Sequence, residues 1–392
     1  MDKPSDFEIE LERIDRDISE LKEAALAARV GSQTATKFAY RLYQRASLAG
    51  NLSEFKAAEA AIENAIRQVG PAPDLYFIKA NLDFTFHRLA EVRRDLELGT
   101  SLSDSLQGRA LQADIDFQEG RYEEAERAYE SLIQDSRTWD NLVRLAYLKA
   151  RMGDVPGAER LYIEAEDELT AKEMRAYAWV ELQRGVLDLR HGRHDDAWAH
   201  YDRADRAYSG YWLVEEHMAE VLGAQGKFDE AIALYEKVIA RVPRPEFQQA
   251  LGELYEFMGK PEQARPWHEK ALAAYIESAE RGEVHYYHHL SDFYSDVRED
   301  GPEAVRWAAK DVEMRENFST LAALAWALYR DRRFSEAFDT INKALSSGVK
   351  DAHIFHQAGM IYLSAGENDE GNRYLQMASE LNPRLRGFHV HR

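Results

Sequence analysis

The 392 residues of this chain include no cysteine. Disulfides, thiolate nucleophiles, iron–sulfur clusters and zinc-finger ligation are therefore excluded. Proline is rare, at 10 residues, and no Gly/Ser-rich linker interrupts the chain. No apolar run approaches the roughly 20 residues that a membrane-spanning helix needs. We therefore expect a chain without a membrane-inserted segment.

Basic residues are outnumbered, with 50 Lys and Arg against 70 Asp and Glu, so the formal charge is −20. A charge of this sign repels phosphate backbones and anionic membrane surfaces, and we expect no nucleic-acid partner. The first residues lack the apolar core of a signal peptide, which favours the cytoplasm. A periplasmic chain whose signal peptide had been removed would look the same.

Signatures of catalysis are also missing. The sequence contains no P-loop, no Gly-x-Gly-x-x-Gly, no Gly-x-Ser-x-Gly and no His-Glu-x-x-His. Paired carboxylates such as Asp195-Asp196 fall where an expected helix begins, and acids there complement the helix dipole. We expect a protein that is not an enzyme and needs no cofactor; an enzyme with its site between repeats is a weaker alternative.

What the sequence does contain is an internal repeat marked by small residues. Successive marks are separated by 33, 39, 34, 33, 40, 33 and 34 residues. The marks are Ala125, Ala158, Ala197, Ala231, Ala264, Ala304, Ala337 and Gly371. A period near 34 residues indicates helix-turn-helix units that stack into a solenoid, since one unit cannot bury its own apolar face.

Other residues recur at fixed offsets from each mark. A glycine precedes five of the marks by five residues, and an aromatic or histidine follows four residues later, as in Gly226, Ala231 and Tyr235. The pattern resembles the tetratricopeptide repeat. This resemblance implies that the glycine turns the chain between two helices, the small residue allows their close approach, and the aromatic fills the gap to the next unit.

The resemblance implies an all-α, right-handed superhelical solenoid of about ten antiparallel helix pairs. Degenerate repeats are expected over 31–104, the main array over 105–383 and a tail over 384–392. Contacts are expected to stay between neighbouring repeats. Arg332 stands where a turn glycine is expected and Glu-Asp-Gly-Pro occupies 299–302, so those two turns are expected to differ.

Residues 1–30 form a separate segment with a heptad-like apolar seam from Phe7 to Ala28. One interpretation is a helix that caps the first repeat. The other is weak self-association through a short coiled coil formed by residues 7–28.

Functional residues of such a solenoid are expected on the concave surface, which first helices line. From the small residue of each first helix, helical periodicity projects positions −6, −3, +1, +4 and +5 into the groove. The predicted groove residues are Glu216, Glu220, Glu246, Gln249, Glu253, Glu256, His285, His288, Asp292, Trp326, Tyr329, Arg330, His353 and His356. Trp326, Tyr329 and Arg330 are residue types that dominate interface hot spots.

The histidines admit three interpretations: aromatic packing, contacts to a bound peptide, or a metal site. His285 and His288 are three residues apart on one expected helix, and Asp292 follows four residues later. That set would suit zinc, copper or nickel better than magnesium or calcium.

The sequence thus predicts a non-enzymatic scaffold that binds an extended or helical segment of a protein partner in its groove. Because the groove wall is acidic, we expect the partner segment to be basic. The alternative is a metal-binding accessory protein that uses His285, His288 and Asp292.

Overall fold

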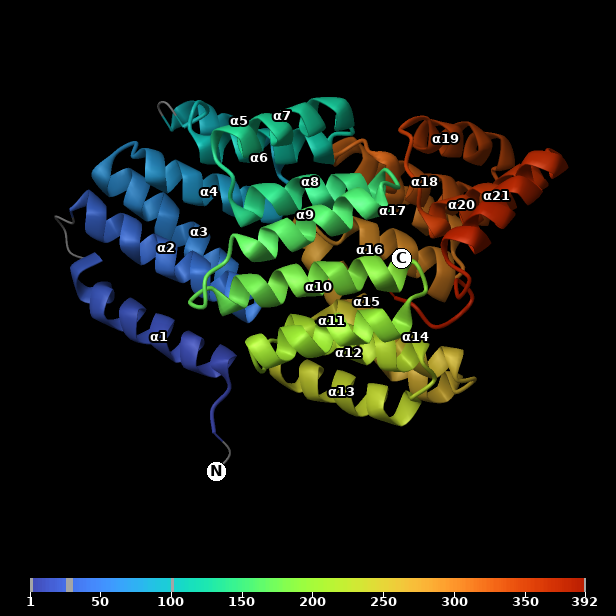
Figure 1. Ribbon diagram of the computed structural model, residues 1–392, viewed down its shortest axis with the longest axis horizontal. Helices are drawn as coiled ribbons and strands as arrows, with labels where there is room; N and C mark the ends of the chain where they lie inside the picture. The colour runs from blue at the N-terminus through green and yellow to red at the C-terminus, as the bar shows by residue number, and fades with distance from the viewer. Residues whose placement is uncertain (1–2, 26–30, 100–101, 391–392) are drawn as a thin grey trace. The chain divides into compact units, whose positions relative to one another are not determined.

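The computed structural model describes residues 3–25, 31–99 and 102–390 (Figure 1). Those residues form 21 α-helices and one π-helix, and no strand. Ala28 of the predicted seam and His391 of the predicted tail lie outside the described residues. After the first helix, the others follow as ten successive pairs, from α2 and α3 to α20 and α21. The expected all-α repeat solenoid is confirmed.

The chain divides into two compact units, and the first comprises Met1–Ile115 together with Tyr208–Tyr211. Its helices are α1 (Asp6–Ala25), α2 (Ser32–Ala49), α3 (Leu52–Val69), α4 (Pro73–Thr85), α5 (Leu89–Leu98) and most of α6 (Leu106–Gln118).

The second unit comprises Asp116–Ala207 and Trp212–Arg392. Its helices are α7 (Tyr122–Asp135), α8 (Trp139–Arg151), α9 (Val155–Asp167), α10 (Met174–Arg190), α11 (His194–Ala207), α12 (Trp212–Ala224), α13 (Phe228–Arg241), α14 (Pro245–Phe257), α15 (Pro261–Glu280), α16 (Tyr287–Asp292), α17 (Gly301–Met314), α18 (Phe318–Arg330), α19 (Phe334–Ser346), α20 (Ala352–Ser364) and α21 (Asn368–Leu381). The π-helix η1 (Phe293–Val297) continues α16.

In several pairs, a small residue of one helix lies against a large residue of the other. A Cβ atom added to Gly185 of α10 would lie 2.2 Å from Cε1 of Tyr201 in α11, and one added to Gly252 of α14 would lie 2.2 Å from Cδ2 of His268 in α15. Tyr201 is fully buried, as the repeat pattern predicted for this aromatic position. The close approach explains why small residues mark the repeat.

The turns inside the pairs share a left-handed residue. Gly153 has φ 86° in the turn between α8 and α9, where glycine avoids the steric cost of this conformation. The expectation of a different turn at Arg332 is wrong, because Arg332 also adopts the left-handed conformation, with φ 61°. The backbone hydrogen bonds agree: the amides of Arg332 and Arg333 donate to carbonyls at the same distances back along the chain as the amides of Gly153 and Asp154 do. Glu299 also has a positive φ, but its turn differs because it follows η1.

Helix α1 buries its seam within the first unit. Ile14 is 2% exposed and Phe7 8% exposed, and α1 contacts α2. The ring of Phe7 stacks on that of Tyr211 at 6.3 Å, and Arg45 of α2 contacts Asp15. The seam is therefore covered by this chain itself, and self-association through it stays a prediction.

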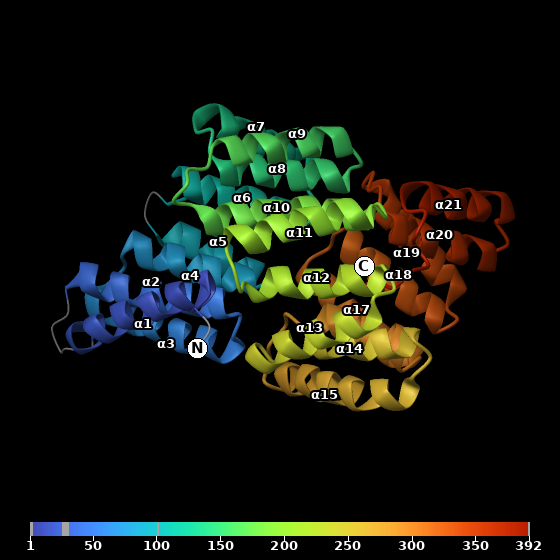
Figure 2. The same ribbon diagram turned by 60° about the horizontal axis from the view of Figure 1, so that its bottom comes forward.

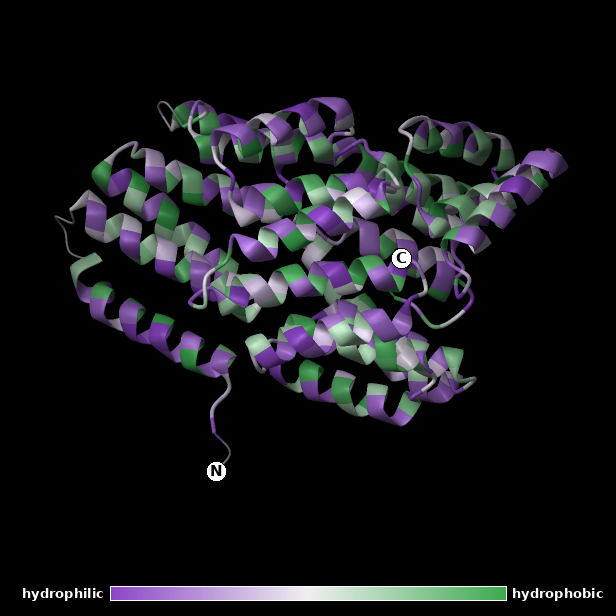
Figure 3. Ribbon diagram, in the orientation of Figure 1, coloured by the Kyte–Doolittle hydropathy of each residue, from purple (hydrophilic) through white to green (hydrophobic). Residues whose placement is uncertain are grey.

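Hydrophobic and hydrophilic residues alternate along the helices (Figure 3). Among the described helices, none is long and apolar enough to cross a bilayer. The apolar residues instead form the stripes that pack one helix on the next, as amphipathic repeats require.

The second unit also contains contacts between distant repeats, so the expectation that contacts stay between neighbouring repeats is wrong. Asn317 Nδ2 donates to the carbonyl oxygen of Gln118 (2.8 Å). The backbone amide of Lys350 donates to the carbonyl oxygen of Arg151 (3.0 Å). The amide of Phe318 donates to the hydroxyl of Tyr122 (2.9 Å). Turns near α7 and α9 therefore pack against the starts of α18 and α20, about 200 residues further along.

Candidate functional site

First helices of the second unit, α12, α14, α16, α18 and α20, and the turn before α16 carry all the predicted groove residues. Several consecutive first helices contact each other directly: α12 contacts α14, α16 contacts α18, and α18 contacts α20. The predicted residues therefore lie along adjoining helices, but their environments differ from one helix to the next.

The two acidic residues of α12 that were predicted to line the groove, Glu216 and Glu220, are buried. Glu216 is 1% exposed and its carboxylate lies 2.9 Å from Nδ1 of His217. Glu220 is fully buried, and its Oε1 accepts hydrogen bonds from Nδ1 of His389 (2.6 Å) and from the amide of Val390 (2.7 Å). A buried carboxylate needs such donors, because desolvation without them is costly. Both residues are thus engaged inside the chain.

Glu246, at the start of α14, is held by Arg244. The Arg244 guanidinium contacts its Oε1, and the hydroxyl of Tyr286 donates to its Oε2 at 3.2 Å. Burial alone would raise the pKa of Glu246, but the charge of Arg244 and its hydrogen bond outweigh this effect and lower the pKa to about 2. Glu246 is therefore ionised and paired at neutral pH.

Further along α14, the side chains become more open. Gln249 Nε2 donates to Glu253 Oε1 (2.8 Å), and the buried Tyr275 donates its hydroxyl to Gln249 Oε1 (2.9 Å). Glu253 is half-buried, and Glu256 is exposed. These two carboxylates provide the accessible negative charge of this helix.

His285 and His289 flank Tyr286, which is buried. The ring of His285 lies 4.1 Å from that of Tyr286, and the ring of His289 stacks on Tyr275 at 5.6 Å. Burial lowers the pKa of each histidine to about 4. The rings are therefore neutral at neutral pH, and their surroundings are the aromatic packing that one interpretation of the sequence predicted.

His288 points to carboxylates instead of to His285. Its Nε2 lies 3.3 Å from Asp292 Oδ2 and its Nδ1 lies 3.3 Å from Asp311 Oδ2. The charge of Asp292 raises the pKa of His288 against the opposing effect of burial. Arg315 also contacts Asp311, so the cluster consists of paired charges.

The structure gives the metal alternative no support. Within residues 3–25, 31–99 and 102–390, no group of three His, Asp or Glu side chains could hold one metal ion. His285 is packed on Tyr286, while His288 and Asp292 form an ion pair.

The predicted trio of α18 lies together and is half-buried. The rings of Trp326 and Tyr329 are stacked, with centroids 4.9 Å apart and an interplanar angle of 17°. Trp326 Nε1 donates to Asp296 Oδ1 (3.0 Å), and Arg330 donates to Glu299 Oε1 (2.7 Å). We call these five residues the Trp326 ledge. Two carboxylates and one guanidinium surround its aromatic pair.

The predicted residues of α20, His353 and His356, are both half-buried. The ring of His353 lies 5.1 Å from that of His389. His389 comes from the predicted tail and is 7% exposed, although terminal segments are usually frayed.

Sequence reasoning missed a largely buried triad of Arg151, Arg190 and Asp351. Oδ2 of Asp351 accepts hydrogen bonds from Nη1 of Arg151 (2.8 Å) and Nη1 of Arg190 (3.0 Å). The two guanidiniums lower the pKa of Asp351 although burial alone would raise it. The groove register could have found both arginines, since each stands five residues after the small residue of its helix, Ala146 or Gly185.

Comparisons with known proteins agree with this repeat architecture. Residues 213–277 match the family model described as "Tetratricopeptide repeat". A search of curated proteins finds no match.

Solved structures with some likeness include the APC/C hetero-tetramer Cut9-Hcn1 (15% identity, TM-score 0.44, 88% of this chain and 74% of that chain covered). Others are MamA (22%, TM-score 0.34, 43% and 96% covered) and a tetratricopeptide repeat protein from Parabacteroides merdae ATCC 43184 (17%, TM-score 0.38, 63% and 94% covered). These likenesses are too weak to bear on how this chain functions.

The matched residues cover α13, α14 and most of α12 and α15. The same succession of helix pairs precedes and follows them, with small residues such as Ala158, Ala231 and Ala337 fully buried between helices. Residues 213–277 therefore contain tetratricopeptide repeats, within a longer array of similar helix pairs.

Proposed function

We propose that this protein is a non-enzymatic scaffold that binds an extended or helical segment of another protein along the first helices α14, α16 and α18. Tetratricopeptide arrays are in general scaffolds for protein–protein interaction, and this supports the class of role. The particular surface is supported by the side chains that these three helices present.

The observation that carries the proposal is the stacked pair Trp326 and Tyr329 on the Trp326 ledge. Both rings are half-buried, so each keeps a face or an edge accessible to solvent. Tryptophan, tyrosine and arginine supply most hot spots of protein interfaces, because they offer large rigid surfaces together with hydrogen-bonding groups. A peptide lying on the ledge would cover these rings.

The charges around the pair indicate the chemistry of the partner. On the ledge, Asp296 and Glu299 are exposed and Arg330 is the one cation; along α14 and α16, Glu256 is exposed, and Glu253 and Asp292 are half-buried. Lys or Arg side chains of a partner would find carboxylates and aromatic faces together here, and both attract cations. We therefore propose that the bound segment is net basic.

Affinity capture from the native host tests this proposal. The double variant Trp326→Ala/Tyr329→Ala is compared with the wild type and with Ile163→Ala, a control at a residue of α9 that is 46% exposed. Thermal midpoints measured first verify that all three chains are folded.

We expect mass spectrometry to identify at least one protein that wild type and Ile163→Ala capture and the double variant loses. Removing a hot-spot aromatic costs about 2 kcal/mol or more, roughly a 30-fold loss of affinity. Capture of the same proteins by all three chains would refute binding at the ledge.

A further inference from the structure

The segment that follows α21 folds back onto the first-helix face of the second unit. After α21 ends at Leu381, the chain passes Gly192, where an added Cβ would lie 2.6 Å from Oδ1 of Asn382. It then reaches α12 and α14, as the red loop leading to the end of the chain in Figures 1 and 2 shows. We call residues 384–390 the tail segment.

Phe388 anchors the tail segment between α12 and α14. It is 4% exposed, and its ring lies 5.9 Å from that of Phe257. Gly223 makes the room, because a Cβ atom at that position would lie 2.5 Å from Cδ1 of Phe388. Leu254 closes the same space, since its Cδ1 lies 3.3 Å from that Cβ position. A small residue of a first helix therefore forms a socket for an aromatic ring.

The next two residues of the tail segment bind Glu220. Nδ1 of His389 and the amide of Val390 both donate to Oε1 of this fully buried carboxylate. Hydrogen bonds to a charged acceptor are stronger than neutral ones. The His353 ring covers His389 from α20. The socket thus recognises an aromatic side chain followed directly by hydrogen-bond donors.

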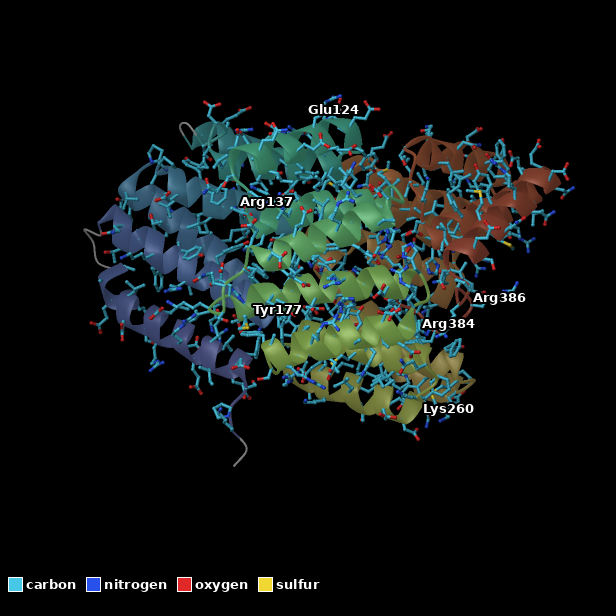
Figure 4. The ribbon with its side chains drawn as sticks, in the orientation of Figure 1. Glu124, Arg137, Tyr177, Lys260, Arg384 and Arg386 are labelled. Atoms are coloured by element: carbon cyan, nitrogen blue, oxygen red, sulfur yellow. The ribbon has the colours of Figure 1, made fainter. Side chains whose placement is uncertain are left out.

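The tail segment also has the charge expected of a partner. Residues 384–392 read Arg-Leu-Arg-Gly-Phe-His-Val-His-Arg, with three arginines, two histidines and no acid, in a chain of formal charge −20. Arg384 and Arg386 are exposed and are labelled in Figure 4. A basic peptide carried by the chain itself therefore occupies an acidic position of the first-helix face.

We propose that the tail segment is an internal competitor that occupies the Phe388–Glu220 socket until a partner segment with an aromatic residue, a following donor and basic flanks displaces it. This inference rests on the proposed function and names the chemistry of the partner. The tail segment is suited to exchange because it contains no helix. Tethering gives it an effective concentration in the millimolar range, which a partner must overcome.

A peptide titration tests the proposal. The probe is a fluorescent synthetic peptide of residues 384–392, measured by anisotropy against the full chain and against a chain that ends at Pro383. A peptide of the same composition in scrambled order is the control probe. Circular dichroism verifies that the shortened chain is folded.

We expect the shortened chain to bind the peptide, and the full chain to bind it on the order of 100-fold more weakly, because its own tail competes. The variant Glu220→Gln in the shortened chain, and Phe388→Ala in the peptide, should each weaken binding by about tenfold or more. The full-length double variant Phe388→Ala/His389→Ala should bind the peptide as the shortened chain does.

Three results would overturn the proposal: a folded shortened chain that does not bind the peptide, equal binding of the scrambled peptide, or a shortened chain that fails to fold. The last result would make the tail segment part of the core. If partner capture still depends on Trp326 and Tyr329, the proposed function then stands even though this inference fails. If the variant Trp326→Ala/Tyr329→Ala captures the same proteins as the wild type, the proposed function is refuted independently of the tail segment.

Discussion

Arg151 and Asp351 form a salt bridge of 2.8 Å across 200 residues of sequence, and each side chain is about one-tenth exposed. The contact joins α8 to the start of α20, two helices that are not in neighbouring repeats. Arg190 of α10 shares the same carboxylate oxygen. One acid therefore neutralises part of the charge of two arginines and links three repeats of the second unit.

Replacing the shared acid should destabilise the fold strongly. Asp351→Asn keeps a side chain that can cap α20, but it leaves two guanidiniums close together without their anion. We expect the free energy of unfolding, measured with urea, to fall by about 3 kcal/mol. Glu303→Ala, which removes an exposed ion pair with Arg306, is the control and should cost less than about 1 kcal/mol. Equal losses in both variants would contradict a special role for Asp351.

Stability should fall as pH decreases from about 6.5 to about 4. Burial lowers the pKa values of His268, His285 and His289 to about 4 in the folded chain, whereas an unfolded histidine has a pKa near 6.5. Within that window the unfolded chain binds more protons than the folded chain, so the free energy of unfolding decreases as pH falls. Each histidine contributes up to about 1.4 kcal/mol per pH unit.

Urea unfolding at several pH values measures this slope, and His289→Gln should reduce it. The carboxylate of Glu246 acts in a lower window, because its folded pKa of about 2 is below the unfolded value near 4.3. Its stabilisation is present above that unfolded value and is lost as pH falls through about 2. A slope that His289→Gln leaves unchanged would show that the ring of His289 is not buried as described.

The close packing inside the helix pairs can be tested with Gly252→Ala. Helix propensity alone predicts a gain of roughly 1 kcal/mol, since alanine is the better helix former. The added Cβ would lie 2.2 Å from His268, so we expect a loss of about 1–3 kcal/mol from overpacking. Glu253→Ala is the adjacent control and should change the thermal midpoint little. A stabilised Gly252→Ala variant would mean that the pair is looser than described.

The proposed basic character of the partner predicts a salt dependence. Once a partner segment is captured, its association rate should fall as ionic strength rises, because the Debye length is near 10 Å at 0.1 M and shortens with added salt. Glu253→Gln should lower the rate at low salt, and Glu236→Gln, at an exposed acid of α13 outside the proposed surface, is the control and should not. Stopped-flow rates that stay constant from low to high salt would argue against electrostatic steering.

The repeat pattern predicted the local structure well because its causes are local. Contacts within one helix pair determine both features of the repeat. The close approach of Gly252 to His268 requires a small residue about every 34 positions, and the positive φ of Gly153 requires a left-handed residue in the turn. The pattern even holds at Arg332, where the non-glycine residue adopts the left-handed conformation.

Contacts between distant repeats could not be predicted in the same way. The partners Arg151 and Asp351 depend on how the small rotations of six successive repeats accumulate, and no single residue reports that sum. The position of the tail segment has the same origin. Its basic composition was visible in the sequence, but Gly223 and Glu220 become a socket only when the chain returns to α12.

Site-specific photo-crosslinking tests most directly whether the Trp326 ledge binds a protein partner. A photoreactive amino acid is placed at Tyr329 in one chain and at Ile163 in another, and both are illuminated in the native host. We expect a discrete crosslinked protein from position 329 that position 163 does not yield, and its crosslinked peptide should be net basic. No crosslinked product from position 329, or the same products from both positions, would contradict the account.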